Sequence, residues 1–133
     1  MNNDQAKPQL IVWWTLWFAL LSGVVIQYAI LSKNSVTAEP LSLNSPLLLA
    51  CLAPFTLSMI IRWVLLPRAK NATTALPIYL VGMVMAEATC LLGIFLAPGH
   101  QQPLFIASVV GIFQYIPVFA QRLIQAGNQS PRI

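Results

Sequence analysis

Residues 76–97 read LPIYLVGMVMAEATCLLGIFLA, an apolar stretch that contains one acidic residue, Glu87. A helix rises about 1.5 Å per residue and the hydrocarbon layer of a bilayer is about 30 Å thick, so this stretch is long enough to cross a membrane. The rise from Leu76 to Glu87 is about 16 Å, which places Glu87 close to the midplane. A carboxyl group at that depth costs roughly 2.5–3.5 kcal/mol, which makes Glu87 a candidate functional residue.

The composition excludes an ordinary soluble protein. Of the 133 residues, 58% are hydrophobic and 8% are charged, whereas a soluble domain carries about a quarter charged residues. The length suits a single domain over residues 1–133. Although the net charge is +4, the basic residues are scattered near the ends of the apolar stretches. We therefore expect no nucleic-acid partner.

Three further apolar stretches have a similar length. The four spans are expected at about residues 9–31, 47–66, 76–97 and 103–123. Prolines lie at or near their first turns (Pro8, Pro46, Pro77 and Pro103), after their ends (Pro67 and Pro98), and inside the second and fourth spans (Pro54 and Pro117), where we expect kinks. Open sheet edges are not tolerated in lipid, so the spans must be helical. The sequence predicts an all-α polytopic membrane protein, with four transmembrane helices in an antiparallel bundle.

The basic residues predict the orientation. Six of the seven lie on one side of the predicted membrane: Lys7, Arg62, Arg68, Lys70, Arg122 and Arg132. Lys33 alone lies on the other side. By the positive-inside rule, a multi-pass protein of a cell inner membrane with this bias has both termini in the cytoplasm.

The third span presents one face of small residues. They recur at three- and four-residue spacing and are Gly82, Ala86, Cys90, Gly93 and Ala97. Such a face allows a second helix backbone to approach closely, and we interpret it as a helix-packing surface. Glu87 is about 100° from Ala86 around the helix axis, so it borders this face and is expected to point toward protein.

Gln114 is the expected partner of Glu87. It lies about 11 residues into the fourth span, at a similar depth, and a neutral Glu87 could donate a hydrogen bond to its side-chain carbonyl. Arg62 is expected to extend toward the membrane interface instead. Glu87 and Gln114 are therefore the candidate proton- or cation-binding residues. Further candidate partners for Glu87 are Thr56, Ser58, Thr89 and Tyr115.

Other chemistry lacks its usual residues. The sequence contains no Ser/His/Asp set, no paired carboxylates, no HExxH and no glycine-rich phosphate loop. Cys51 and Cys90 lie in apolar stretches and are interpreted as buried free thiols, while His100 is interpreted as a solvated loop residue. We expect no catalytic residues, no metal site, no cofactor and no enzymatic activity.

Residues 82–96, in which Ala86-Glu87-Ala88 is followed by Gly93, resemble the ion-binding helix of the rotary ATP synthase c subunit. The resemblance implies that Glu87 is protonatable. It does not imply a place in a rotor, because the other three spans lack the family's GxGxGxG helix. The four-span plan also resembles the small multidrug resistance transporters, whose embedded glutamate belongs to the first span rather than the third. It is similar as well to small uncharacterised bacterial four-span inner-membrane proteins.

Two functions follow as hypotheses. The first is a non-enzymatic membrane protein, an accessory or assembly subunit, in which Glu87 is a polar packing residue or a protonatable site. The second is a small proton- or cation-coupled transporter with Glu87 as the switching carboxyl. The candidate partners are the lipid bilayer, further copies of the chain in a homo-oligomer, and a larger membrane complex.

Overall fold

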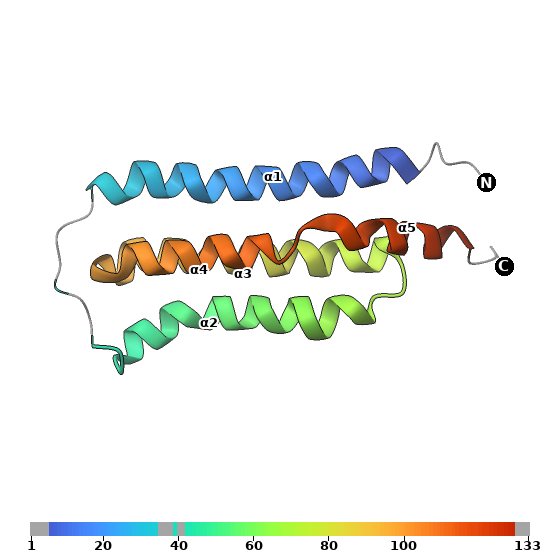
Figure 1. Ribbon diagram of the computed structural model, residues 1–133. Helices are drawn as coiled ribbons and strands as arrows, with labels where there is room; N and C mark the ends of the chain where they lie inside the picture. The colour runs from blue at the N-terminus through green and yellow to red at the C-terminus, as the bar shows by residue number, and fades with distance from the viewer. Residues whose placement is uncertain (1–5, 35–38, 40–41, 130–133) are drawn as a thin grey trace.

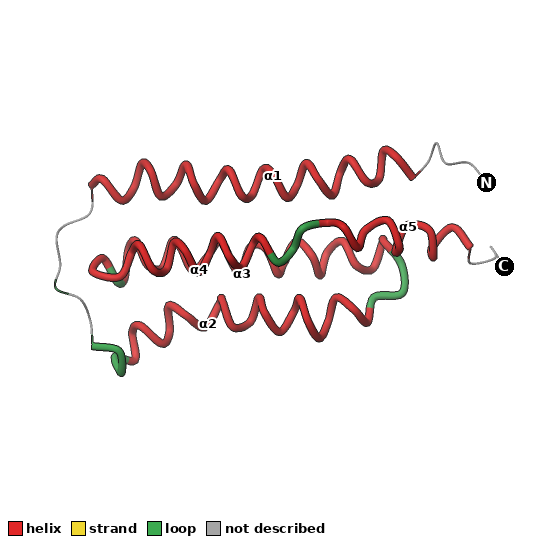
Figure 2. The backbone as a smooth tube through the Cα atoms, viewed as in Figure 1, coloured by secondary structure: helices red, strands yellow, loops and turns green. Residues whose placement is uncertain are grey.

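Four helical segments, each long and apolar enough to cross a membrane, make up most of the computed structural model, which describes residues 6–34, 39 and 42–129 (Figure 1). Their long helices are α1 (Ala6–Leu31), α2 (Pro46–Ile60), α3 (Ala72–Leu96), α4 (Gln101–Phe113) and α5 (Ala120–Gln129). Short helical turns connect or extend them: η1 (Ser32–Asn34), η2 (Ile61–Leu65), η3 (Leu66–Arg68), η4 (Pro98–His100) and η5 (Pro117–Phe119). Figure 2 shows no strand in the described residues, so the predicted all-α four-helix bundle is confirmed.

Helix α3 is at the centre of the packing. It contacts α1, α2 and α4, and it is the most buried of the four segments. Helix α1 is the least buried and leaves apolar side chains such as Ile11, Phe18 and Ile26 exposed. The large exposed apolar surface is what a protein dissolved in lipid requires, since lipid tails are as apolar as these side chains.

Most of the described basic residues gather at one end of the bundle. Where α1 begins and α5 ends, the chain carries Lys7, Arg62, Arg68, Lys70 and Arg122, and we call this the basic end (Figure 1). Lys33 follows α1 at the opposite end. Arg132, which was expected on the basic side, lies outside the described residues.

Helix α3 begins earlier than the sequence predicts, at Ala72 rather than near residue 76. The cause is a cap: Asn71 Oδ1 accepts hydrogen bonds from the backbone N–H of Thr74 at 2.9 Å and from Thr74 Oγ1 at 2.8 Å. An N-cap of this kind satisfies N–H groups that the first turn leaves without partners. Pro77 therefore lies inside the helix, about one turn farther from its first residue than expected.

The fourth segment breaks where a kink was expected. Helix α4 ends at Phe113, Ile116 is extended (φ −47°, ψ 124°), and Pro117 begins the separate turn η5. A proline disfavours the α conformation in the residue before it and cannot bond to the carbonyl four residues earlier, which explains the break. Pro54 has a milder effect, because α2 continues through it to Ile60.

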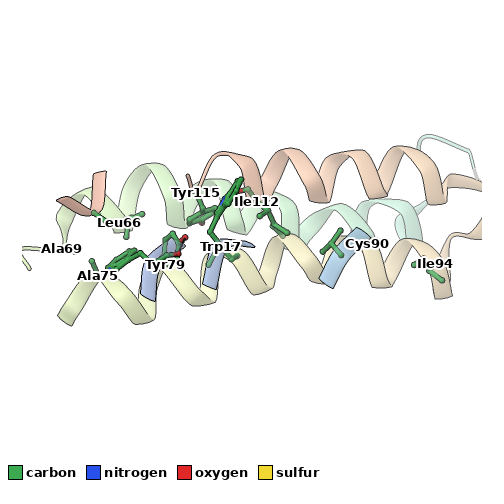
Figure 3. Packing of buried hydrophobic residues seen from close by; sticks show 14 residues of the cluster. Trp17, Leu66, Ala69, Ala75, Tyr79, Cys90, Ile94, Ile112 and Tyr115 are labelled. Carbon is green, nitrogen blue, oxygen red and sulfur yellow. Dashed lines mark hydrogen bonds between the residues drawn. The ribbon is translucent and has the colours of Figure 1, made fainter. Parts of the chain in front are cut away.

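The larger of the two buried apolar clusters of the described residues extends along α3 from Ala75 to Ile94 and includes side chains of α1 and α4. Trp17, Tyr79, Ile112 and Tyr115 lie together there (Figure 3). Trp13 is also buried, with its ring 4.6 Å from that of Tyr79 between centroids. Trp13 and Trp17 thus face the protein interior, while Trp14 is half-buried.

Candidate functional site

Glu87 is bonded to helix α1. Its Oε1 accepts a hydrogen bond from Gln27 Nε2 at 2.6 Å, and both side chains are half-buried. Gly23 lies one turn away on α1, and a Cβ built there would be 3.8 Å from Glu87 Oε1. The α1 backbone at position 23 therefore lies beside the acid, with room for a methyl group in ordinary contact.

The sequence interpretation missed Gln27. Its signal was present, because Gln27 carries the one side-chain amide between Leu10 and Leu31. Polar side chains within a membrane span tend to face other helices and to pair there. A side-chain amide in one span and a carboxyl in another were therefore reasonable partners.

One polar atom of this pair has no partner. Gln27 Oε1 is buried and accepts no hydrogen bond from the described residues. A buried carbonyl oxygen without a donor is unfavourable, by roughly 1–3 kcal/mol. The Gln27 side chain thus uses its Nε2 in the bond to Glu87, while its Oε1 lacks a hydrogen-bond donor.

Gln114 does not meet Glu87, so the expected pairing is wrong. Its side-chain Oε1 accepts from Trp63 Nε1 at 3.2 Å, and its backbone carbonyl accepts from Arg62 Nε at 2.6 Å. The reason is register: a Cβ on Gly111 would be 2.8 Å from the Cβ of Ala86. Gln114 lies three residues beyond Gly111 and Glu87 one residue beyond Ala86 in the opposite direction, so Gln114 is about 6 Å closer to the basic end than Glu87.

The other candidate partners of Glu87 are also bonded elsewhere. Ser58 Oγ donates to the Gly82 carbonyl at 2.8 Å, and Tyr115 Oη donates to the Ser58 carbonyl at 2.6 Å. Thr89 donates to Met85 O at 3.4 Å and Thr56 to Ala53 O at 2.8 Å, each within its own helix. Ser58 and Tyr115 instead connect α2, α3 and the break after α4.

The small residues of α3 lie at its contact with other helices. Gly82, Ala86, Cys90, Gly93 and Ala97 are all buried. A Cβ on Gly93 would be 2.7 Å from Leu104 Cβ, and one on Gly82 would be 2.0 Å from Tyr115 Oη. These approaches leave no room for larger side chains on α3, so its glycines accommodate the bulky side chains of Leu104 and Tyr115.

No group of three or more metal-binding side chains is found among the residues that the structure describes. Cys51 and Cys90 are free and buried. His100 is half-buried in η4. The side chains of Glu87 and Arg62 are the charged groups that the described part of the bundle bonds between its helices, through Gln27 and the Gln114 carbonyl.

Comparisons with protein-family models, curated proteins and solved structures found no match to this chain. The site must accordingly be interpreted from its own geometry.

Proposed function

We propose that this chain is a non-enzymatic, multi-pass protein of a cell inner membrane that acts as an accessory or assembly subunit. In this proposal neutral Glu87 fastens helix α1 to the other helices. The observation that carries it is the 2.6 Å hydrogen bond between Gln27 Nε2 and Glu87 Oε1, which joins α1 to α3 inside the span. The charge distribution supports an orientation with both termini in the cytoplasm, because the basic end carries five of the six described Lys and Arg residues.

The free oxygen of Gln27 supports a neutral Glu87. A protonated carboxyl group has one O–H donor, whereas a carboxylate has none. If that O–H points to Gln27 Oε1, the amide and the acid form two hydrogen bonds in opposite directions, and the buried Gln27 Oε1 gains its missing donor. A carboxylate would instead face that oxygen with a second acceptor.

Helix α1 depends on a small number of polar contacts with the rest of the bundle. Besides the Gln27–Glu87 bond, Trp17 Nε1 donates to the Ile112 carbonyl at 3.0 Å and Tyr79 Oη donates to the Trp13 carbonyl at 3.4 Å. Since α1 is the least buried segment, its exposed side is available to lipid, to another copy of the chain or to a larger membrane complex. A subunit role is consistent with this arrangement.

The second candidate function is a proton- or cation-coupled transporter. The surroundings of Glu87 favour it. Glu87 is partly exposed, and its hydrogen-bond partner Gln27 has a second side-chain atom, Oε1, that has no donor. Carboxylate and amide oxygens can bind a proton or a hard cation such as Na⁺. In this alternative Glu87 would load and release the ion during each cycle.

Replacing Glu87 with Gln separates the two functions. Glutamine keeps the size of the acid and supplies an N–H donor for Gln27 Oε1, but it cannot ionise. The subunit proposal expects a stably folded E87Q protein with normal assembly in the membrane and unchanged cell physiology. The matched variant E87A removes both hydrogen bonds and is expected to weaken assembly.

Transport measurements on the E87Q variant test the alternative function. Loss of proton flux or of cation resistance in a stably folded E87Q variant would reject the packing role and favour the transporter. Unchanged flux in E87Q, together with weakened assembly in E87A, would reject the transporter.

A further inference from the structure

Arg62 lies in an irregular turn near the basic end. It belongs to η2, where the helix widens to a π-type turn between α2 and η3. The N–H of Leu66 bonds to the Ile61 carbonyl, five residues earlier. Single π-type turns of this kind are frequent at functional sites because they redirect a side chain. Here the turn accompanies an Arg62 side chain that reaches the break after α4.

The guanidinium of Arg62 is fixed on one edge. Its Nε donates to the backbone carbonyl of Gln114 at 2.6 Å. That carbonyl is available because the helix does not continue past Phe113, so no N–H four residues later reaches it. The guanidinium carbon also lies 4.7 Å from the ring centroid of Phe119 and 5.3 Å from that of Trp63.

The positive charge has no counter-ion in the protein. Among the described residues, the acidic side chains are those of Glu39 and Glu87. Glu39 precedes α2 at the opposite end, and Glu87 is bonded to Gln27. Within the described residues, no acceptor is hydrogen-bonded to the terminal nitrogens of the Arg62 guanidinium. Gln114 Nε2 is a further donor without a partner. Arg62 and Gln114 therefore keep donors that the described residues do not satisfy.

The depth of this group suits a lipid head group. The guanidinium contacts Phe119, the last residue before α5. Helix α5 is polar on its exposed side, where it carries Gln121, Arg122 and Gln125. Arg62 lies six residues before the end of the apolar segment Pro46–Arg68. A long basic side chain at such a position can extend its charged end toward the membrane interface, where the lipid phosphates lie.

From this geometry we infer an anionic phospholipid site at the basic end, in which the terminal nitrogens of Arg62 bind the lipid phosphate. A guanidinium presents parallel N–H donors that match two phosphate oxygens, and basic pockets between membrane helices bind such head groups. Nε stays on the Gln114 carbonyl, and the rings of Trp63 and Phe119 keep the guanidinium plane in place. This site is independent of the function proposed for Glu87.

The test uses native mass spectrometry of the full chain. The protein is mixed in detergent with equal amounts of phosphatidylglycerol and phosphatidylcholine, and the lipid that remains bound is counted. We expect preferential retention of phosphatidylglycerol by the unaltered chain. Retention should fall about tenfold in R62Q, the factor expected from the loss of one hydrogen bond to a charged group.

Two variants control for charge and for folding. R68Q removes the same charge from an exposed position of η3 and is expected to keep most of the bound lipid. R62K keeps the charge but lacks the guanidinium fork, so it should fold and still bind less phosphatidylglycerol than the unaltered chain. Circular dichroism in the same detergent verifies that each variant is helical.

Three results would overturn the assignment. The first is equal retention of the two lipids by the unaltered chain, and the second is an equal loss in R62Q and R68Q. The third is unchanged retention in R62K. Inorganic phosphate is added as a separate arm, and release of the bound lipid at millimolar phosphate would identify free phosphate, rather than lipid, as the ligand.

Discussion

Gly82 lies against the hydroxyl of Tyr115, so closely that a Cβ atom at position 82 would be 2.0 Å from Tyr115 Oη. Tyr115 is fully buried and its hydroxyl donates to the Ser58 carbonyl at 2.6 Å. The ring therefore has little freedom to move away. This one contact ties the small-residue face of α3 to the break after α4 and, through Ser58, to α2.

Replacing Gly82 with Ala should destabilise the bundle. The added methyl group overlaps a ring that is fixed by packing and by a hydrogen bond, and overpacking of this kind costs about 1–3 kcal/mol. Thermal unfolding in detergent, followed by circular dichroism, measures the effect. Gly23→Ala is the matched control, because its Cβ would make only ordinary contacts at 3.8 Å. Equal stability of the two variants would contradict the prediction.

Replacing Gln27 and Glu87 with Leu, singly and together, should reveal coupling between the two positions. Each single change leaves one polar partner without its hydrogen bond, whereas the double change removes both partners. Within membranes such coupling averages about 0.6 kcal/mol and reaches about 1.7 kcal/mol. We expect Q27L/E87L to be more stable than the sum of the single changes implies. Additive effects in a double-mutant cycle would show that the two side chains do not interact.

Replacing Trp17 with Phe should weaken the attachment of α1. The change removes the buried hydrogen bond from Trp17 Nε1 to the Ile112 carbonyl, a loss of about 0.5–1.5 kcal/mol. Trp63→Phe removes a comparable bond to Gln114 Oε1 from a ring that is 63% exposed, and it should cost less. Unfolding of both variants in the same detergent provides the comparison, and a larger loss in Trp63→Phe would refute this ranking.

Replacing Asn71 with Ala should loosen the first turn of α3. The side chain caps the backbone N–H of Thr74, and loss of such a cap costs about 0.5–2 kcal/mol. Hydrogen exchange measured at residues 72–76 should become faster, since these amides report local opening. Thr73→Ala, at an exposed position of the same turn, should leave the exchange unchanged. No difference between the two variants would mean that the cap does not stabilise the helix.

The small-residue face shows how far a single span can be interpreted from sequence. The spacing of Gly82, Ala86 and Gly93 fixes which side of α3 lacks bulk, because a regular helix places them on one face. The spacing does not indicate which helix will lie there. In the structure, the contact of Gly93 with Leu104 identifies it as α4.

The partner of Glu87 shows where sequence interpretation ends. Counting residues from the expected starts of the spans placed Gln114 at the depth of Glu87. This count was wrong because α3 starts earlier, at Ala72, and because Gly111 rather than Gln114 lies opposite Ala86. An error of one turn moves a side chain by about 5 Å, more than a hydrogen bond can span.

The sequence by itself determined four helices of membrane length, because an apolar chain in lipid must satisfy its backbone hydrogen bonds within each span. It also determined the basic end and the small face of α3, which depend on residue order along single helices. The tertiary structure alone decided that Glu87 pairs with Gln27 and that Arg62 binds the Gln114 carbonyl. Such pairs depend on the relative rotation and register of helices that are distant in the sequence.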